Sequence, residues 1–444
     1  MSAAAAVARE FDLVIWGASG FTGALASEYV SRAYAPGGAV RFAFGGRDRT
    51  KLERTRERIA VKLNDARVRD VPLVVADCVE KLPEACARAS CVLTFAGPYD
   101  APHAYALVKA CVEAKTHYVD ITGEPQFVRE VVDTVQDDAR SGGVGVISCA
   151  GYDSVPWDLG VYACAKALKE DDGALYRAAA HAGKSKGGVS GGTIASAANA
   201  LSSATTKKFR GMGDPFFFAR DALKARKDID GDKVRWAKPQ SGTKFDEDTK
   251  LWTMPSIMAG INSKVIARSF ALDDGSRGYM PNFTYDESDF CASKTAARLG
   301  TLALGVFGAC FITPPLRWLM RKTILPAQGE GPSEHTRETG FSNIYVVGTG
   351  VNTKTNEPME PVCAHFEFKN ADPGYKGTAA LATEVALCLA IPSERSRLSW
   401  ADQPGRGGCF TASHAMGDVL IERLNKAQNF SITVAALKNT VIHV

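Results

Sequence analysis

The stretch "FDLVIWGASGFTG", residues 11–23, is an apolar run that breaks into three glycines, Gly17, Gly20 and Gly23. Its apolar half predicts a buried parallel strand, and the residues after the glycines predict a helix over about 21–33. The free N–H groups and the positive dipole end of that helix favour a phosphate, and glycines let the backbone approach a pyrophosphate. The spacing is G-x-x-G-x-x-G rather than the commoner G-x-G-x-x-G, so the loop alone also suits a turn that only packs helix on strand.

The strand is followed by a regular alternation of apolar and amphipathic segments. A polar helix is predicted from "RTKLERTRERIAVKL" at 49–63, and further helices separate most of the later strands. This order indicates a Rossmann-type doubly wound parallel sheet, which is an α/β fold. The six predicted strands are 11–16, 40–46, 71–77, 91–97, 117–121 and 144–151.

The length of 444 residues exceeds what one hydrophobic core usually organises, so we expect two domains. Residues 1–160 are predicted to form an NADP-binding Rossmann domain. Residues 161–400 are predicted to form a second α/β domain, inserted before a C-terminal segment, 401–444, that returns to the Rossmann domain.

The end of the second strand indicates which dinucleotide is bound. A carboxylate there would bind the ribose hydroxyls of NAD, whereas a cation would accommodate the extra phosphate of NADP. Arg47 follows the strand directly, with Arg49 and Lys51 close behind, and an arginine fork suits a phosphate dianion. We therefore expect NADP, although Asp48 leaves NAD open and the cations could also be solvated charges that open a helix. Asp77, which closes the third strand, is placed either to meet the adenine amine or to cap the next helix.

The fourth and fifth strands end in "FAGPYD" and "YVDITGE". Ligands of such sheets bind outside the carboxyl ends of the strands. Tyr99 or Glu124 could supply a proton while a hydride moves to the substrate. Alternatively, Gly97 and Pro98 only make a turn, and Asp120 only caps a helix. The residues expected to border the nicotinamide are Gly97, Pro98, Tyr99, Asp120, Thr122, Gly123 and Glu124.

Several longer motifs stand out: "GASGFTG", "GGRDRTKL", "FAGPY", "YVDITGEPQF" and, at 149–160, "CAGYDSVPWDLG". With these motifs the chain resembles the saccharopine dehydrogenase-like oxidoreductases, whose relatives include the bacterial trans-acting enoyl reductases. The similarity continues through 374–389 and 407–424 and so covers nearly the whole chain. The resemblance implies a Rossmann domain interrupted by an α/β domain, with "GYDSVP" lining the site entrance. The residues that it implies for cofactor binding are Gly17, Ser19, Gly20, Phe21, Thr22 and Arg47.

The family name suggests a substrate with several carboxylates, which would need convergent arginines. We identify no such cluster in the sequence of the second domain, so saccharopine is not the expected substrate. Within "GYDSVP", Tyr152 is a third candidate proton donor. Alternatively, Tyr152 and Pro156 shape a turn, and Asp153 caps the helix that begins near Trp157.

The second domain offers few further residues that suggest chemistry. "GGVSGGTIASAANAL" at 187–201 is rich in glycine; Thr193 or Ser196 could approach a ligand there, unless the run is only a packing device. The seven histidines are dispersed, and none lies three or four residues from another histidine or a cysteine, so we expect no metal site. The sequence contains neither G-x-S-x-G nor a P-loop motif.

Two segments raise the question of a lipid surface. Within residues 299–316, the fifteen before Pro314 would make an uncharged helix of roughly 22 Å, short of the roughly 30 Å of a bilayer's hydrocarbon core. Such a helix could lie in a membrane interface or be buried in the protein. Residues 205–227 mix seven lysines and arginines with Phe209 and the triplet at 216–218. That mixture suits an anionic membrane surface, or a solvated loop with a few buried rings.

Composition narrows the class and the location. The chain is 45% hydrophobic and 23% charged, as globular proteins are, and its net charge of +4 is too small to argue for nucleic acid. The eleven scattered cysteines suit a reducing compartment rather than a disulfide framework. Since "MSAAAAVAREF" is no secretory signal, we expect an intracellular protein, in the cytoplasm or on the surface of lipid droplets or membranes. The sequence does not decide whether the chain forms a homodimer.

These features give two hypotheses for the function. The first is an NADPH-dependent reductase that transfers a hydride to an apolar, lipid-like or enone substrate. The second is a non-catalytic NADP-binding protein that is associated with membranes or lipid droplets. The intact glycine loop favours the first hypothesis, and the lack of one unmistakable acid favours the second.

Overall fold

The computed structural model describes residues 9–187, 211, 213–229, 234–313, 315, 316, 318, 320 and 331–444. The chain forms two compact units. The first unit contains residues 1–122, 130–148 and 379–409, and the second contains residues 123–129, 149–378 and 410–444. The chain therefore passes between the units several times.

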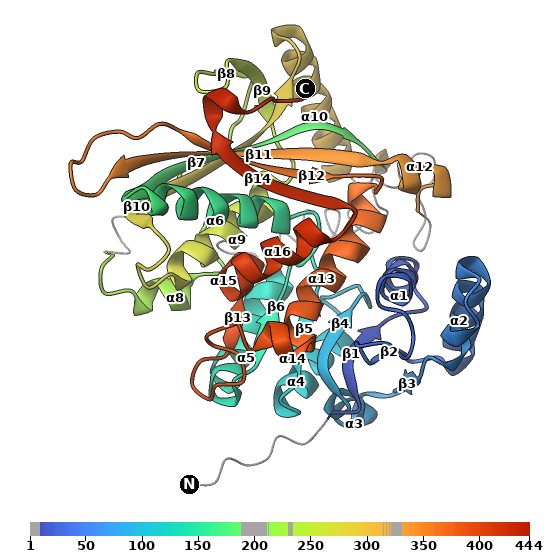
Figure 1. The fold of residues 1–444 in the computed structure, drawn as a ribbon. Helices are drawn as coiled ribbons and strands as arrows, with labels where there is room; N and C mark the ends of the chain where they lie inside the picture. The colour runs from blue at the N-terminus through green and yellow to red at the C-terminus, as the bar shows by residue number, and fades with distance from the viewer. Residues whose placement is uncertain are drawn as a thin grey trace. The chain divides into compact units, whose positions relative to one another are not determined.

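The first unit is built on a seven-stranded sheet in the order β13-β6-β5-β4-β1-β2-β3 (Figure 1). The pairs from β3 to β6 are all parallel, and their order is that of a dinucleotide-binding Rossmann sheet. This confirms the expected fold class, and all six predicted strands are present. The strands are β1 (Phe11–Trp16), β2 (Phe42–Gly46), β3 (Leu73–Val75), β4 (Ala89–Thr94), β5 (His117–Asp120), β6 (Gly145–Ile147) and β13 (Gly408–Phe410).

Helices cover this sheet because its central strands are apolar on both faces, as in β1, where every residue is buried. Helix α13 reaches the unit from far along the sequence: Tyr29 and Tyr34 each donate a hydrogen bond of 2.8 Å to the buried Glu384. Helix α5 begins in the second unit and continues in the first. The helices are α1 (Phe21–Tyr34), α2 (Arg49–Leu63), α3 (Leu82–Ala87), α4 (Pro102–Glu113), α5 (Pro125–Gly142), α13 (Thr378–Ala390) and α14 (Pro392–Arg395).

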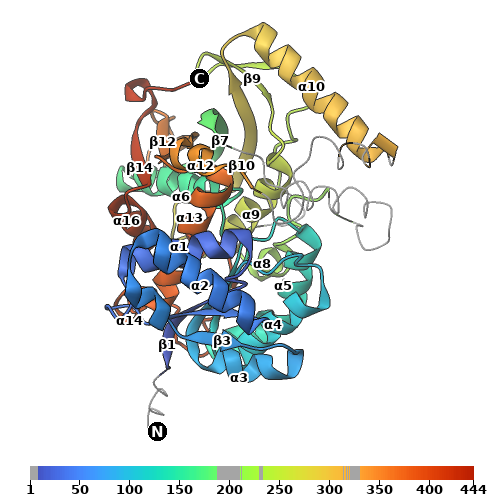
Figure 2. The same cartoon turned by 90° about the vertical axis from the view of Figure 1, so that its right-hand side faces the viewer.

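The second unit is built on another seven-stranded sheet, in the order β14-β12-β11-β7-β10-β9-β8 (Figures 1 and 2). Its strands pair antiparallel, except that β7 and β10 are parallel. The strands are β7 (Gly173–Lys186), β8 (Lys244–Asp246), β9 (Leu251–Pro255), β10 (Tyr279–Cys291), β11 (Phe341–Asn352), β12 (Val362–Phe368) and β14 (Phe430–Ala436). The helices are α6 (Val155–Glu170), α8 (Arg220–Ala225), α9 (Ala259–Leu272), α10 (Lys294–Ile312), α12 (Glu334–Thr339), α15 (Ala412–Met416) and α16 (Asp418–Lys426).

Helix α6 packs closely on this sheet because small residues face each other. A Cβ atom on Gly160 would lie 2.5 Å from Val346 Cγ2, and one on Gly348 would lie 2.7 Å from Cβ of Cys164. Asp158 of the same helix is buried and accepts hydrogen bonds from Ser413 N (2.9 Å) and Ser413 Oγ (2.7 Å). The core of the second unit therefore includes residues from its C-terminal part.

This division differs from the domain boundaries expected from the sequence. The segment that returns to the first unit is 379–409, not 401–444. Residues 410–444 belong to the second unit because β14 pairs with the whole length of β12. The two boundaries depend on pairing between distant segments, which the local sequence pattern does not report.

The two segments that suggested a lipid surface differ in burial. The rings of Phe216, Phe217 and Phe218 are buried, and the last two pack in a core cluster with Val128 and Val265. The alternative of a few buried rings therefore holds for this triplet. Helix α10, in contrast, is almost entirely exposed on one side. Thr193 and Ser196 lie outside the described residues.

Candidate functional site

The turn between β1 and α1 has the geometry that its three glycines suggested. Gly17 has a φ of +79°, a conformation that favours glycine. The N–H groups of Gly17 and Ala18 both donate to the carbonyl oxygen of Gly45, at 2.9 and 3.1 Å, so the turn is held against β2. A Cβ atom on Gly23 would collide with the carbonyl oxygen of Gly17. Helix α1 can therefore begin directly against the loop only because Gly23 has no side chain.

The N-terminus of α1 is open to an anion. Its N-cap is Gly20, no side chain caps it, and its first turn contains no acidic residue. Ser19 and Gly20 are exposed, and Phe21 and Thr22 are half-buried. Since the first-turn N–H groups of a helix have no partner within the helix, this end of α1 can hold a phosphate group.

Arg47 and Asp48, at the end of β2, have separate roles. The side chain of Asp48 is the N-cap of α2 and accepts a hydrogen bond of 3.0 Å from the backbone N–H of Lys51. Arg47 is exposed and makes no hydrogen bond or ion pair with any residue that the structure describes. The carboxylate that left NAD open is therefore engaged, and the cation that suggested NADP is available.

Asp77 lies just beyond β3, and its side chain is 60% exposed. It forms an ion pair of 2.8 Å with Lys81, and this hydrogen bond lowers the pKa of its carboxyl group. The next helical turn has Cys78 at its N-cap, without a side-chain hydrogen bond. The capping alternative for Asp77 is therefore wrong.

Tyr99 is buried just after β4, beyond the cis peptide bond between Gly97 and Pro98. Its hydroxyl donates a hydrogen bond of 2.9 Å to the carbonyl oxygen of Thr94. The hydroxyl of this candidate acid is therefore already engaged by the strand end.

Asp120 joins the ends of two neighbouring strands. Its buried carboxylate accepts hydrogen bonds of 2.9 Å from the N–H of Thr122 and from Ser148 Oγ, which follows β6. Glu124 is also buried and directly precedes α5. Gly123 and Glu124 belong to the second unit, whereas Thr122 belongs to the first.

Tyr152, in the second unit, has an engaged hydroxyl. It lies 3.0 Å from Ser342 Oγ, and the ring stands edge-on to Trp157 and Phe368, each at 5.3 Å between ring centroids. Burial raises the pKa of Tyr152 well above its ordinary value. The backbone N–H of Tyr152 also donates a hydrogen bond of 3.1 Å to Thr378 Oγ1. The side chain is thus neutral at neutral pH and held by contacts on several sides.

The carboxyl group of Asp153 does not have the capping role considered for it. The N-cap of α6 is Ser154, and no side chain caps this helix. Asp153 makes no hydrogen bond with any residue that the structure describes, and burial raises its pKa to about 6. A carboxyl group with such a pKa can both hold and release a proton near neutral pH.

Two further carboxyl groups, those of Glu287 and Asp289, both lie on strand β10. Burial raises the pKa of Glu287 to about 8 and that of Asp289 to about 6. Glu287 accepts hydrogen bonds from Tyr285 OH (2.7 Å), Ser256 Oγ (3.0 Å) and Asn262 Nδ2 (3.3 Å). The charges of both groups, when ionised, also raise the pKa of Tyr152. Neither group was predicted from the sequence. The alternation in "YDESDF" was the available signal, but alternation does not say which side of the strand is buried.

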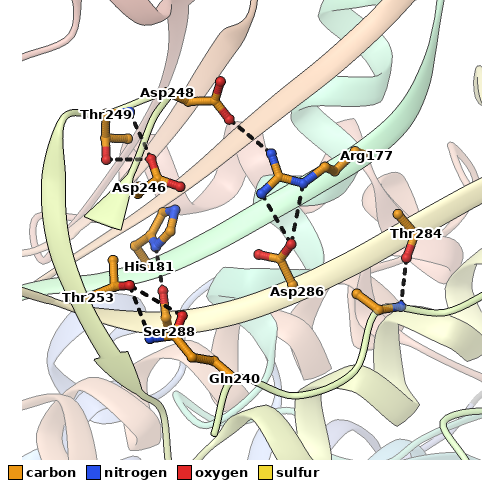
Figure 3. Close-up of polar contacts among 11 residues, drawn as sticks. Arg177, His181, Gln240, Asp246, Asp248, Thr249, Thr253, Thr284, Asp286 and Ser288 are labelled. Carbon is orange, nitrogen blue, oxygen red and sulfur yellow. Dashed lines mark hydrogen bonds and ion pairs between the residues drawn. The ribbon is translucent and has the colours of Figure 1, made fainter. Parts of the chain in front are cut away.

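The intervening residues of β10 point to the other side of the sheet (Figure 3). There Arg177 Nη1 lies 2.9 Å from an oxygen of Asp248, and its Nη2 lies 3.2 Å from one of Asp286. His181 Nδ1 lies 2.8 Å from Ser288 Oγ, and burial lowers the pKa of His181 to about 4. This paired network ties strands together. Among the described residues, no group of three or more His, Cys, Asp or Glu side chains suits a metal ion.

The candidate residues therefore fall into two groups. The glycine loop, Arg47 and Tyr99 belong to the first unit. Glu124, Tyr152, Asp153 and Glu287 belong to the second. The first group has the features of an anion and nucleotide site, and the second contains the carboxyl groups that can exchange protons near neutral pH.

Comparisons with known proteins identify the family of the chain. The family model of the saccharopine dehydrogenase NADP-binding domain matches residues 13–147. The chain is 34% identical over 444 aligned positions to a Mycobacterium tuberculosis protein provisionally named a trans-acting enoyl reductase, covering 95% of this chain and 97% of that one. It is 32% identical to the trans-acting enoyl reductase of Mycobacterium bovis, covering 94% and 96%. Among solved structures, saccharopine dehydrogenase (L-Glu forming) from Saccharomyces cerevisiae is similar, with a TM-score of 0.48, 10% identity, and 96% and 99% of the two chains covered.

Proposed function

Because the chain belongs to the saccharopine dehydrogenase-like oxidoreductases, we propose that it is an NADPH-dependent reductase of an apolar, lipid-like or enone substrate. The observation that carries the proposal is the uncapped N-terminus of α1, which follows a glycine turn and lies in the same unit as the unpaired Arg47. The bound cofactor would supply the hydride. The protein would hold the phosphates, orient the substrate and supply a proton.

The choice of NADPH over NADH rests on the residues after β2. An NAD site would need a carboxylate there for the ribose hydroxyls, but Asp48 already caps α2. Arg47 can instead form a bidentate contact with the 2′-phosphate of NADP. The 2′-phosphate of NADP would therefore contact a guanidinium group that no other described side chain neutralises.

The proposed substrate class follows from the pairing of the arginines in the second unit. A substrate with several carboxylates needs arginines that are free to bind it. Here most arginines that the structure describes already have partners within the protein. Arg177, Arg226 and Arg268 form ion pairs with aspartates, and Arg277 donates to the carbonyl oxygens of Ser413 and His414. The named relatives are enoyl reductases, and an enone or enoyl substrate needs no such cations.

Reduction of an enone adds a hydride to one carbon of the double bond and a proton to the other. Tyr99, Glu124 and Tyr152 are the proton donors that the sequence proposes. Asp153 is a stronger candidate than the two tyrosines, because their hydroxyls already bind Thr94 and Ser342. We propose that Asp153, which neighbours Tyr152 in the chain, delivers the proton in its neutral form.

The test is enone reduction by purified protein, followed as loss of NADPH absorbance over a range of pH. Wild-type activity should fall as pH rises above about 6, because the donor must be protonated. Asp153→Asn should lower kcat and remove this limb of the profile, whereas Tyr152→Phe, the matched control, should retain it. If Asp153→Asn keeps both kcat and the limb while Tyr152→Phe loses activity at every pH, Tyr152 is the donor instead.

The second candidate function is a non-catalytic NADP-binding protein associated with membranes or lipid droplets. The exposed apolar side of α10 favours it. The same assay separates the two candidates: tight NADPH binding without oxidation by any enone or enoyl thioester would support the second one.

A further inference from the structure

Helix α10 belongs to the second unit, and among the described residues it packs on β9 and β10 along one side (Figure 2). Ala297 and Phe311 are buried on that side, and Thr301 Oγ1 lies 3.3 Å from Thr243 Oγ1. At the start of the helix, Lys294 Nζ lies 4.9 Å above the centre of the Trp252 ring. These contacts fix the orientation of the helix, so its opposite side has a defined composition.

That opposite side is apolar and exposed. Leu299, Leu302 and Val306 are between 55% and 64% exposed, and no charged residue occurs from Leu299 to Thr313. Trp318, just beyond the helix, is 59% exposed. An exposed helix side normally carries polar residues, so a continuous apolar stripe of this kind marks a docking surface. Among the described residues, α10 is the one helix long and apolar enough to cross a membrane by length and composition.

The charges in this part of the sequence indicate what the stripe docks on. From Lys294 to Gln328 the sequence contains five lysines and arginines and no aspartate or glutamate. Lys294 and Arg298 are exposed at the start of the helix. Cations beside an apolar stripe suit a surface with anionic headgroups and an apolar interior, and tryptophan is favoured at that boundary.

We propose that α10 is an interfacial helix that docks the protein on an anionic phospholipid surface. The exposed leucines and valine enter the boundary between headgroups and acyl chains, while the attached side stays on the protein. A spanning helix would need lipid on all sides, but Ala297, Thr301 and Phe311 pack on the protein instead. A second copy is disfavoured as the occupant, because a two-fold contact would bring like charges together.

The test is flotation of the full-length protein with vesicles, first of phosphatidylcholine alone and then with phosphatidylserine added. Wild-type protein should float with the anionic vesicles, and less so as salt is raised. Leu302→Glu/Val306→Glu should lose at least tenfold of the bound fraction. The matched control is Val61→Glu/Val441→Glu, which also replaces two exposed apolar residues by glutamate, but outside α10, and should float like wild type.

The outcomes separate this inference from the proposed reaction. NADPH binding measured on the same samples reports that each variant is folded, and it should be unchanged in all of them. Wild-type protein that stays in solution with both vesicle types overturns the inference, whatever its reductase activity. A dimer in light scattering that Leu302→Glu/Val306→Glu dissociates, without vesicle binding, would assign the stripe to self-association instead.

Discussion

At the scale of single residues, Arg47 and Asp48 are neighbours with opposite charges and different uses. Their order in the chain does not separate their roles, and Asp48 therefore left NAD open. The structure separates them because Asp48 caps α2, while Arg47 forms no hydrogen bond or ion pair with any described residue. The physical reason is that a helix N-terminus binds a carboxylate in preference to an arginine.

The first prediction concerns Arg47. Arg47→Ala should weaken NADPH binding about 10- to 100-fold and leave NADH binding nearly unchanged, because only NADPH carries the phosphate that the guanidinium binds. Isothermal titration calorimetry with both cofactors measures this. Asp48→Ala is the control: it should lose about 1 kcal/mol of stability through the missing cap and keep the preference for NADPH. An equal loss for both cofactors in Arg47→Ala would contradict the phosphate contact.

The second prediction concerns Glu287, whose pKa is raised by burial from 4.5 to about 8. Between these values the native state keeps the proton and the unfolded chain releases it, so the free energy of unfolding falls as pH rises, by up to about 1.4 kcal/mol per pH unit. Glu287→Gln removes this dependence. Its melting temperature should therefore rise relative to wild type between about pH 5 and about pH 8.

Calorimetric melting of both proteins across that pH range is the measurement. Glu360→Gln, which changes an exposed carboxylate paired with Lys438, should follow the wild-type curve. Parallel curves for Glu287→Gln and wild type would show that Glu287 is ionised in the folded protein.

At the scale of elements, the strand β1, its glycine turn and the helix α1 could be predicted from the sequence. The burial of α10 and of the 216–218 triplet could not. Each of those two segments had two interpretations; the structure shows that the rings of the triplet are buried and that one side of α10 is exposed. Local composition reports that a segment is apolar. It does not report whether another segment covers it.

The third prediction concerns the close approach of α1 to the glycine turn. Gly23→Ala places a methyl group against the carbonyl oxygen of Gly17, so the first turn of α1 must shift and its N–H groups no longer converge. NADPH affinity should fall about tenfold or more. Gly260→Ala in α9, where an added Cβ meets no atom within 4 Å, is the control and should bind normally. Normal binding by Gly23→Ala would exclude this end of α1 as the phosphate site.

At the scale of the whole molecule, the candidate residues are distributed over both units. The nucleotide features belong to the unit with the parallel sheet, and the titratable carboxyl groups of β10 and Asp153 belong to the other. The C-terminal strand β14 completes the second sheet, where Phe430 packs against Phe366 and Phe368.

The fourth prediction follows from this division. Phe430→Ala removes a buried ring from the second unit and should destabilise the protein by about 3 kcal/mol. The Kd for NADPH should stay unchanged below the melting temperature, because the residues proposed to bind it belong to the first unit. Calorimetric melting and titration of the same sample test both parts. A large loss of NADPH affinity in the folded variant would show that the second unit contributes to the nucleotide site.

The sequence by itself determined the Rossmann sheet, the position of the glycine turn and the cation after the second strand. These features depend on the order and periodicity of residues that are neighbours in the chain, so they can be read locally. The tertiary structure alone decided the partner of the C-terminal strand, the exposed side of α10, and the raised pKa values of Asp153 and Glu287. These properties depend on burial and pairing by segments that are distant in sequence, and desolvation by such segments is what moves a carboxyl pKa upward.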